Sequence, residues 1–156
     1  MALITILIAG LISACGLSSD REKAVANANT AIEDVDRSGS RIADAIATLS
    51  ASSAGTRDLS PVREAGESYL SSVEELNGAL RALGATSSTL QAHIQDTFLP
   101  AAEAAANDCQ RALEQLREDS VDDESLRSAI TLLGRCIDRY AGAVAGVSTE
   151  YSKISE

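Results

Sequence analysis

Cys109 and Cys136, two of the chain's three cysteines, have the spacing of a disulfide between neighbouring helices. Residues 120–123 have the composition of a turn. If the helices on either side of this turn run antiparallel, two residues lie opposite each other when their numbers add to about 245. Cys109 and Cys136 meet this condition. Closing such a loop stabilises a fold by roughly 3 to 4 kcal/mol. A redox-active pair is the alternative, but no Cys-x-x-Cys motif is present, so we expect a structural disulfide.

A possible calcium loop begins at Asp34, where Asp34, Asp36 and Gly39 match the first half of an EF-hand. The second half does not match, because the position of the bidentate carboxylate is occupied by Ala45. The helical apolar pattern also continues through Gly39. We therefore expect a helix here, with no metal bound.

The single histidine, His93, lies beside the apolar stripe of its expected helix, so we interpret it as a flanking surface residue. One histidine without a cysteine cluster provides too few ligands for haem or zinc. No Gly-x-Ser-x-Gly turn accompanies a possible His-based triad. The sequence therefore predicts a protein that is not an enzyme and has no cofactor.

The third cysteine, Cys15, follows Ile12-Ser13-Ala14 and an uncharged apolar run over residues 2–11. The run is shorter than the ~20 residues of a membrane-spanning helix and is typical of an export signal. This N-terminus resembles those of bacterial lipoprotein precursors, which end in an aliphatic residue, two small residues and a cysteine that becomes the lipidated first residue. The resemblance implies removal of residues 1–14 and attachment of acyl chains, palmitate among them, to Cys15. An uncleaved membrane anchor is the alternative.

The same resemblance implies a location on the extracytoplasmic side of a bacterial membrane. In Gram-negative members, the absence of Asp directly after the lipidated cysteine favours the outer membrane, and this chain has Gly16 there. Residues 15–19 are then the lipidated N-terminus and a short tether, followed by a helical domain over residues 20–156. Thiols outside the cytoplasm normally oxidise, which favours the Cys109–Cys136 disulfide.

Charge limits the classes of partner. The chain has 23 acidic and 13 basic residues, a net charge of −10. This balance argues against nucleic-acid binding and against electrostatic attraction to anionic lipid, so the acyl chains must provide the attachment. About 140 residues remain after cleavage, enough for one domain.

The apolar pattern of the mature chain is helical throughout and predicts four helices. The first covers about residues 20–50, with Ser19 and Glu22 as a capping box; the second starts at Ser60-Pro61 and ends at Gly84. The third is capped by Ser88 with Gln91 and kinked at Pro100, and the fourth is capped by Ser120 with Asp123. The apolar stripe of the fourth is the most regular: Leu126, Ile130, Leu133, Ile137, Tyr140, Val144, Val147, Tyr151 and Ile154.

Four amphipathic helices with short connections bury their stripes most simply as an all-α, antiparallel up-down-up-down four-helix bundle with left-handed, heptad-like packing. A three-helix arrangement with the first helix as a stalk is the main alternative. Because residues 16–19 reach at most ~14 Å, the bundle must stand close to the bilayer. The 51–60 loop and the acidic turn then lie at its far end.

Two surfaces are candidates for contact with a partner. One is the acidic turn, whose members are Glu118, Asp119, Asp122, Asp123 and Glu124. Its alternative role is to solvate a turn and complement a helix dipole. The other is the pair Gly142 and Gly146, four residues apart, which lets another helix approach closely. Its alternative role is packing within the domain.

Two functions are consistent with this sequence. The first is a lipid-anchored accessory or scaffold subunit that binds a protein partner in an envelope complex. The alternative is a lipoprotein that holds a small apolar molecule between helices, where the Ala-rich segment 101–106 leaves room.

Overall fold

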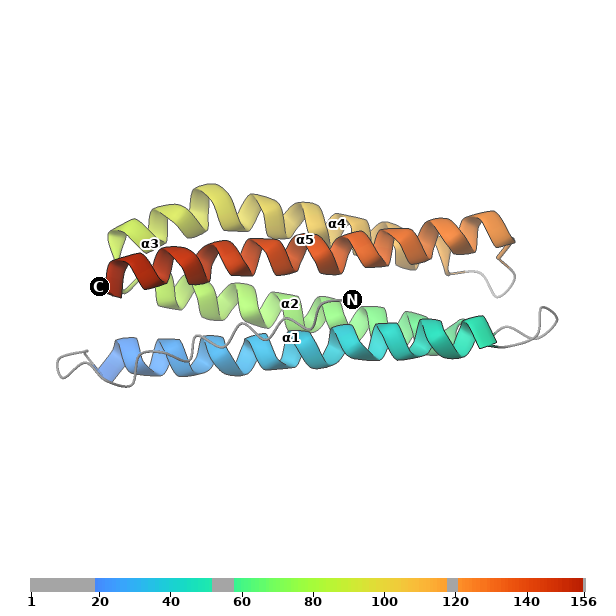
Figure 1. Ribbon diagram of the computed structural model, residues 1–156, viewed down its shortest axis with the longest axis horizontal. Helices are drawn as coiled ribbons and strands as arrows, with labels where there is room; N and C mark the ends of the chain where they lie inside the picture. The colour runs from blue at the N-terminus through green and yellow to red at the C-terminus, as the bar shows by residue number, and fades with distance from the viewer. Residues whose placement is uncertain (1–18, 52–57, 118–120, 156) are drawn as a thin grey trace.

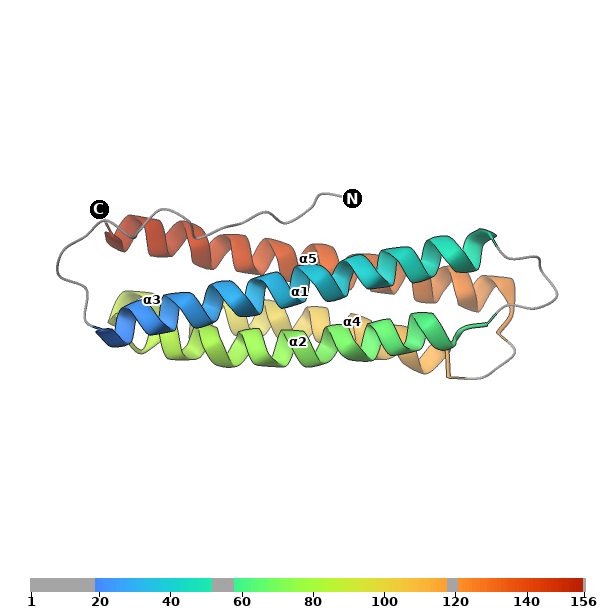
Figure 2. The ribbon, with the colours of Figure 1, turned by 90° about the horizontal axis from the view of Figure 1, so that it is seen from below.

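The computed structural model describes residues 19–51, 58–117 and 121–155, and every element in these ranges is a helix. The elements are α1 (Ser19–Ala51), α2 (Ser60–Gly84), α3 (Ser88–His93), the π-helical η1 (Ile94–Phe98), α4 (Leu99–Gln115) and α5 (Asp123–Ser155). Figures 1 and 2 show these helices side by side along one long axis. The protein is a helical bundle, and the all-α prediction is confirmed.

The helices share one apolar core. Helix α1 packs along α2, and α4 packs along α5 (Figures 1 and 2). All seven stripe positions that the sequence predicts on α2 are buried: Val62, Ala65, Tyr69, Val73, Leu76, Leu80 and Leu83. In α5 the predicted stripe is also inside, with Ile130, Ile137 and Ile154 only partly buried. Within the described ranges, no helix combines the length and apolar character needed to cross a bilayer.

At the starts of α3 and α5, the capping residue differs from the one that the sequence predicts. Helix α3 is capped by Ser87, not Ser88, and the Ser87 hydroxyl accepts a hydrogen bond from the Leu90 amide at 3.5 Å. Helix α5 begins at Asp123, so the prediction of a start after a Ser120 cap was wrong. The Asp122 carboxylate caps it, accepting from the Ser125 amide at 2.7 Å.

The start of α2 also differs in its cap. Pro61 occupies the first turn as predicted, but the residue before the helix is Leu59, whose side chain makes no capping hydrogen bond. The Asp58 carboxylate instead accepts from the Ser60 amide at 3.0 Å. The Asp58 side chain therefore binds the backbone at the start of α2, where the sequence predicts Ser60 as the cap.

A π-helical segment lies just before Pro100 in the third helical stretch, in which the sequence predicts a kink at this proline. Proline has no N–H to donate into an α-helical ladder, and the five residues of η1 end two positions before Pro100. The Leu99 amide donates to the Ile94 carbonyl, five residues back. The wider turn shifts the apolar stripe by one position, so Ala102 is buried and the predicted Ala101 is only partly buried.

Candidate functional site

The predicted lipidation site, Cys15, lies outside the described residues, as do the signal segment 1–14 and most of the tether. Helix α1 begins at Ser19, the last residue of the predicted tether. The described part of the chain therefore starts four positions after Cys15 in the sequence.

The disulfide between Cys109 and Cys136 is present, as the sequence predicts. It joins α4 to α5 with a Cα–Cα distance of 5.5 Å, within the usual range for disulfides. Both residues are buried in the core. The bond fixes the register of α4 against α5 near the middle of the bundle.

Beside this disulfide lies a charged cluster that the sequence analysis missed, which we call the Asp108 cluster: Asp108, Arg111, Arg135 and Arg139. Asp108 on α4 is only 4% exposed. Its two carboxylate oxygens accept hydrogen bonds from Arg135 at 3.1 Å and Arg139 at 2.8 Å, both from α5. Arg111, one turn along α4, approaches the same carboxylate at 3.9 Å. The register that pairs the cysteines could have revealed this cluster, because it places Asp108 between Arg135 and Arg139.

The predicted acidic surface is only partly described, because Glu118 and Asp119 lie outside the described residues. Asp122, Asp123 and Glu124 are exposed at the start of α5. Hydrogen bonds from the backbone and side chain of Ser125 hold the pKa of Asp122 below its ordinary value. Asp122 therefore acts as a helix cap, which agrees with the alternative role of this turn.

Gly142 and Gly146, the glycine pair on α5 that the sequence offers as a contact surface, occupy different environments. Gly146 faces His93 of α3, whose Nε2 would lie 3.6 Å from a Cβ built at this glycine. This contact is packing within the domain, and His93 is partly buried instead of a simple surface residue. Gly142 is exposed, and a Cβ built there would meet nothing within 4 Å. Of the pair, Gly142 alone presents open surface.

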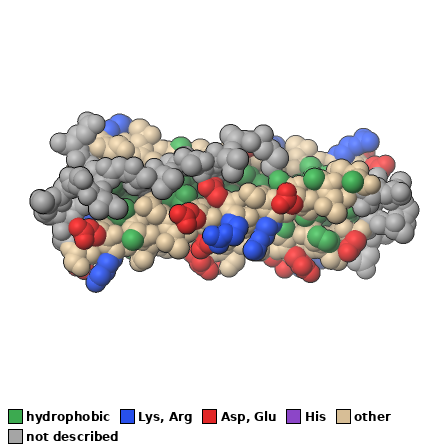
Figure 3. Space-filling view, turned by 60° about the horizontal axis from the view of Figure 1, so that its bottom comes forward, with side chains coloured by type: hydrophobic (Ala, Val, Ile, Leu, Met, Phe, Trp, Pro, Cys, Tyr) green, Lys and Arg blue, Asp and Glu red, His purple; other side chains and the backbone are tan. Residues whose placement is uncertain are grey.

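The segment that resembles a calcium loop is helical. Residues 34–39 lie inside α1, and the Asp34 carboxylate pairs with Arg37 one turn later at 2.6 Å. Figure 3, in which the α1 side of the molecule is turned forward, shows acidic and basic side chains close together on the surface. Within the described ranges, no group of three or more His, Cys, Asp or Glu side chains is placed to hold a metal ion.

Three aromatic rings meet in the core. The Tyr140 ring packs edge-on against Tyr69, with ring centres 6.4 Å apart, and against Phe98 at 5.9 Å. The Tyr140 hydroxyl donates to the Asn77 side-chain oxygen at 2.9 Å and lies 3.3 Å from the Val73 carbonyl. The Tyr69 hydroxyl is buried with no hydrogen-bond partner among the described residues. Burial raises the pKa of both phenols above the ordinary 10.0, so both stay neutral at physiological pH.

A groove of about 540 Å³ lies between α2 and α4. Its apolar side chains come from both helices: Leu70, Val73, Leu99, Ala102 and Ala106. Glu74, Asn77, Arg81, Glu103 and Gln110 add polar groups. The groove is open to solvent and is not the closed, dry pocket that would most strongly indicate an apolar ligand.

Comparison with protein-family models, with curated proteins and with solved structures finds no match to this chain.

Proposed function

We propose that this protein is a lipid-anchored, non-enzymatic accessory or scaffold subunit that binds a protein partner in a bacterial envelope complex. The observation that carries the proposal is the pairing of the cysteines. Cys109 and Cys136 form a disulfide, which is typical of compartments outside the cytoplasm. The one other cysteine is Cys15, at the end of the motif that resembles a lipoprotein signal.

The arrangement that we propose for the bundle is antiparallel, up-down-up-down and left-handed. The contacts between residues 108–109 and residues 135–139 support opposite directions for α4 and α5. The order of colours along the helices in Figure 1 supports the same alternation for the whole chain. A tether of a few residues then holds the end with the start of α1 near the bilayer and leaves the acidic turn far from it.

Gly142 and the acidic turn are the surfaces that we propose for partner contact. Gly142 is exposed and leaves room for a close approach to the backbone of α5. A partner helix that packs there gains van der Waals contact without displacing a side chain. Gly146 is a weaker candidate, since His93 already covers it.

The anchor is tested by the intact mass of the full chain, purified from bacterial membranes, and by a Cys15→Ala variant. The natural protein should lack residues 1–14 and carry acyl chains, whereas Cys15→Ala should leave the membrane fraction with its helicity unchanged. A Cys109→Ala/Cys136→Ala double variant is the matched control, because it changes cysteines but should stay attached. An unmodified Cys15 in a chain that retains its first residues rejects the anchor.

The partner role is tested by crosslinking in intact envelopes, followed by mass spectrometry of the copurifying proteins. One partner should recur, and a bulky Gly142→Trp variant should reduce its yield. Gly134→Trp is the matched control, because Gly134 is also an exposed glycine of α5 with nothing near its Cβ position. A chain that crosslinks to no neighbour argues against the accessory role.

The α2–α4 groove favours a second candidate function, the binding of a small apolar molecule. Ala102 and Ala106 both line this groove, so the Ala-rich segment leaves room between the helices. Native mass spectrometry of the protein from membranes would detect such a ligand. Ala106→Trp, which fills the groove, should abolish binding, and Ala104→Trp, on an exposed part of α4 outside the groove, should not. A protein that carries no small molecule contradicts this candidate.

A further inference from the structure

The Asp108 cluster has an excess of positive charge on a protein whose net charge is −10. Three guanidinium groups surround one carboxylate, which leaves two positive charges without a partner within the cluster. The carboxylate is almost fully buried, with 6% of its side chain exposed, whereas the side chains of Arg111, Arg135 and Arg139 are 66%, 50% and 52% exposed. The solvent-facing part of the cluster is therefore made of arginine donors.

The positions of these donors are fixed by the fold. Asp108 holds Arg135 and Arg139 with one hydrogen bond to each carboxylate oxygen. Cys109 follows Asp108 and Cys136 follows Arg135 in the sequence, and the disulfide between these cysteines fixes the position of α4 relative to α5. Each guanidinium has five N–H donors in a planar fork, so most donors of the cluster are left over after these bonds.

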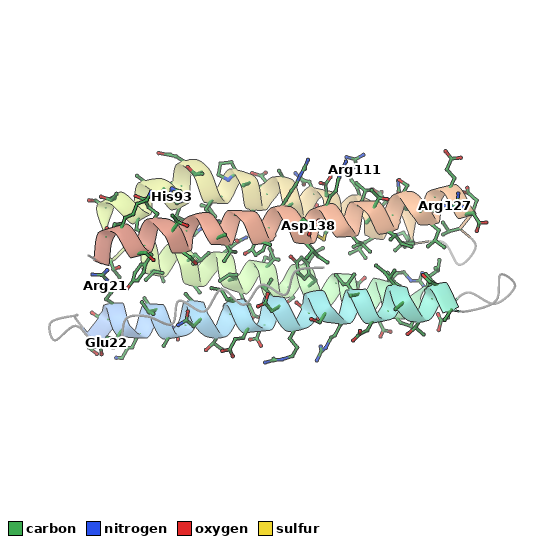
Figure 4. The ribbon with its side chains drawn as sticks, viewed as in Figure 1. Arg21, Glu22, His93, Arg111, Arg127 and Asp138 are labelled. Atoms are coloured by element: carbon green, nitrogen blue, oxygen red, sulfur yellow. A yellow bond between two sulfur atoms is a disulfide. The ribbon has the colours of Figure 1, made fainter. Side chains whose placement is uncertain are left out.

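Neighbouring acidic side chains do not neutralise the excess. Glu114 lies one turn from Arg111, and Asp138 lies one turn from Arg135, but no ion pair joins either carboxylate to the cluster in the ranges that the structure describes. In Figure 4 the Arg111 side chain projects from the α4 side of the molecule, away from Asp138.

We propose that the Asp108 cluster binds a phosphate group. A tetrahedral oxyanion with two negative charges matches both the excess charge and the forked donors, because arginine binds phosphate through paired hydrogen bonds. Asp108 is a positioning residue in this site, and Arg111, which is held least by Asp108, supplies donors to the ligand. The site does not depend on the lipid anchor or on a protein partner. Inorganic phosphate and phosphate monoesters carry close to two negative charges at neutral pH, whereas the phosphodiester of a phospholipid headgroup carries one negative charge.

Binding of inorganic phosphate to the full chain in a non-ionic maltoside detergent, which contains no phosphate, tests the site when it is measured by calorimetry. Arg111→Gln should weaken the affinity by about tenfold, the effect of one lost charge-assisted hydrogen bond. Its melting temperature should stay the same, since the ion pair of Arg111 with Asp108 is long, at 3.9 Å, and the Arg111 side chain is 66% exposed. Arg111→Lys, which keeps the charge, should restore part of the affinity.

The matched control is Arg127→Gln, which removes the same charge from an exposed position of α5 outside the cluster (Figure 4). It should change phosphate affinity by less than about twofold. Equal effects of Arg111→Gln and Arg127→Gln would show a general charge effect and overturn the proposal. Phosphate that binds no better than chloride at the same ionic strength would also overturn it.

Reconstitution of the full chain into vesicles, at an ionic strength that screens the membrane charge, tests whether a lipid headgroup occupies the site instead. If a headgroup occupies it, inorganic phosphate should bind in vesicles of a galactolipid, which contains no phosphate, and fail to bind once phosphatidylglycerol is added. If free phosphate is the ligand, its affinity should be the same in both. Loss of phosphate binding in both kinds of vesicle, with the fold intact, would contradict the site.

Discussion

Asp108 on α4 accepts a hydrogen bond from Arg139 on α5 at 2.8 Å, directly beside the residue that forms the disulfide. Covalent and ionic contacts therefore hold the same two helices at the same level. We expect Asp108→Asn to lower the free energy of unfolding by about 1 to 2 kcal/mol, because it keeps the size of a buried acceptor but removes its charge. Urea denaturation measures the change.

Asp138→Asn is the control for that variant. Asp138 is exposed on α5 and has no ion pair with the described arginines, so its substitution should change stability by less than about 0.5 kcal/mol. Equal losses in the two variants would mean that the contacts of Asp108 contribute no stability of their own.

The regular part of the fold was predictable from the sequence because burial of an amphipathic helix repeats every three or four residues. All seven predicted residues of the α2 stripe are buried. The helix register also predicted the Cys109–Cys136 disulfide, since residues that lie opposite each other across a turn can be counted.

The candidate sites were less predictable, because they depend on distances between helices. The groove lined by Ala102 and Ala106 depends on how far apart α2 and α4 lie. The spacing of apolar residues along each helix does not give this distance. The one-position shift to Ala102 comes from the π-helical turn before Pro100. The prediction of the cap of α5 was wrong for a local reason. Asp and Ser are both good capping residues, so the sequence alone does not decide between Ser120 and Asp122, and the structure has Asp122 as the cap.

The cap at Asp122 predicts a contribution of known sign to acid sensitivity. Its pKa is lowered in the folded chain, so its stabilisation is full above the ordinary value of 3.8 and is lost as the pH falls through the lowered pKa. Asp122→Asn keeps an oxygen that can accept from Ser125 but does not titrate. The difference in free energy of unfolding between wild type and Asp122→Asn should therefore shrink below that pH. A difference that stays constant from pH 7 to pH 2 would contradict this assignment.

Tyr69 and Tyr140, whose rings pack against each other in the core, predict opposite effects for the same change. Tyr140→Phe should lower the free energy of unfolding by about 1 kcal/mol, because it removes a hydroxyl that donates to Asn77. Tyr69→Phe should be neutral or stabilising by up to about 1 kcal/mol, because the lost hydroxyl is buried with no partner among the described residues. Thermal unfolding of the two variants compares them directly, and a larger loss for Tyr69→Phe would disprove the assignment.

The exposed glycines of the helices predict gains in stability. Gly134 lies inside α5, and a Cβ added there meets nothing within 4 Å, so Gly134→Ala should raise the free energy of unfolding by about 0.5 to 1 kcal/mol. Gly142→Ala should give a similar gain for the same reason. A gain in stability at Gly142 together with a lower yield of crosslinked partner would show that this glycine serves binding. A loss of stability at Gly134 would contradict the open surface described for it.

The disulfide should contribute more stability than any of these single contacts. It closes a loop between residues 27 positions apart, for which loop-closure entropy gives about 3 to 4 kcal/mol. Guanidinium denaturation of the full chain with and without reductant should show this difference. The Cys109→Ala/Cys136→Ala variant should match the reduced wild type to within about 1 kcal/mol and should not respond to reductant. A wild-type chain that unfolds at the same denaturant concentration with and without reductant would mean that the Asp108 cluster and the apolar core hold α4 against α5 without the bond.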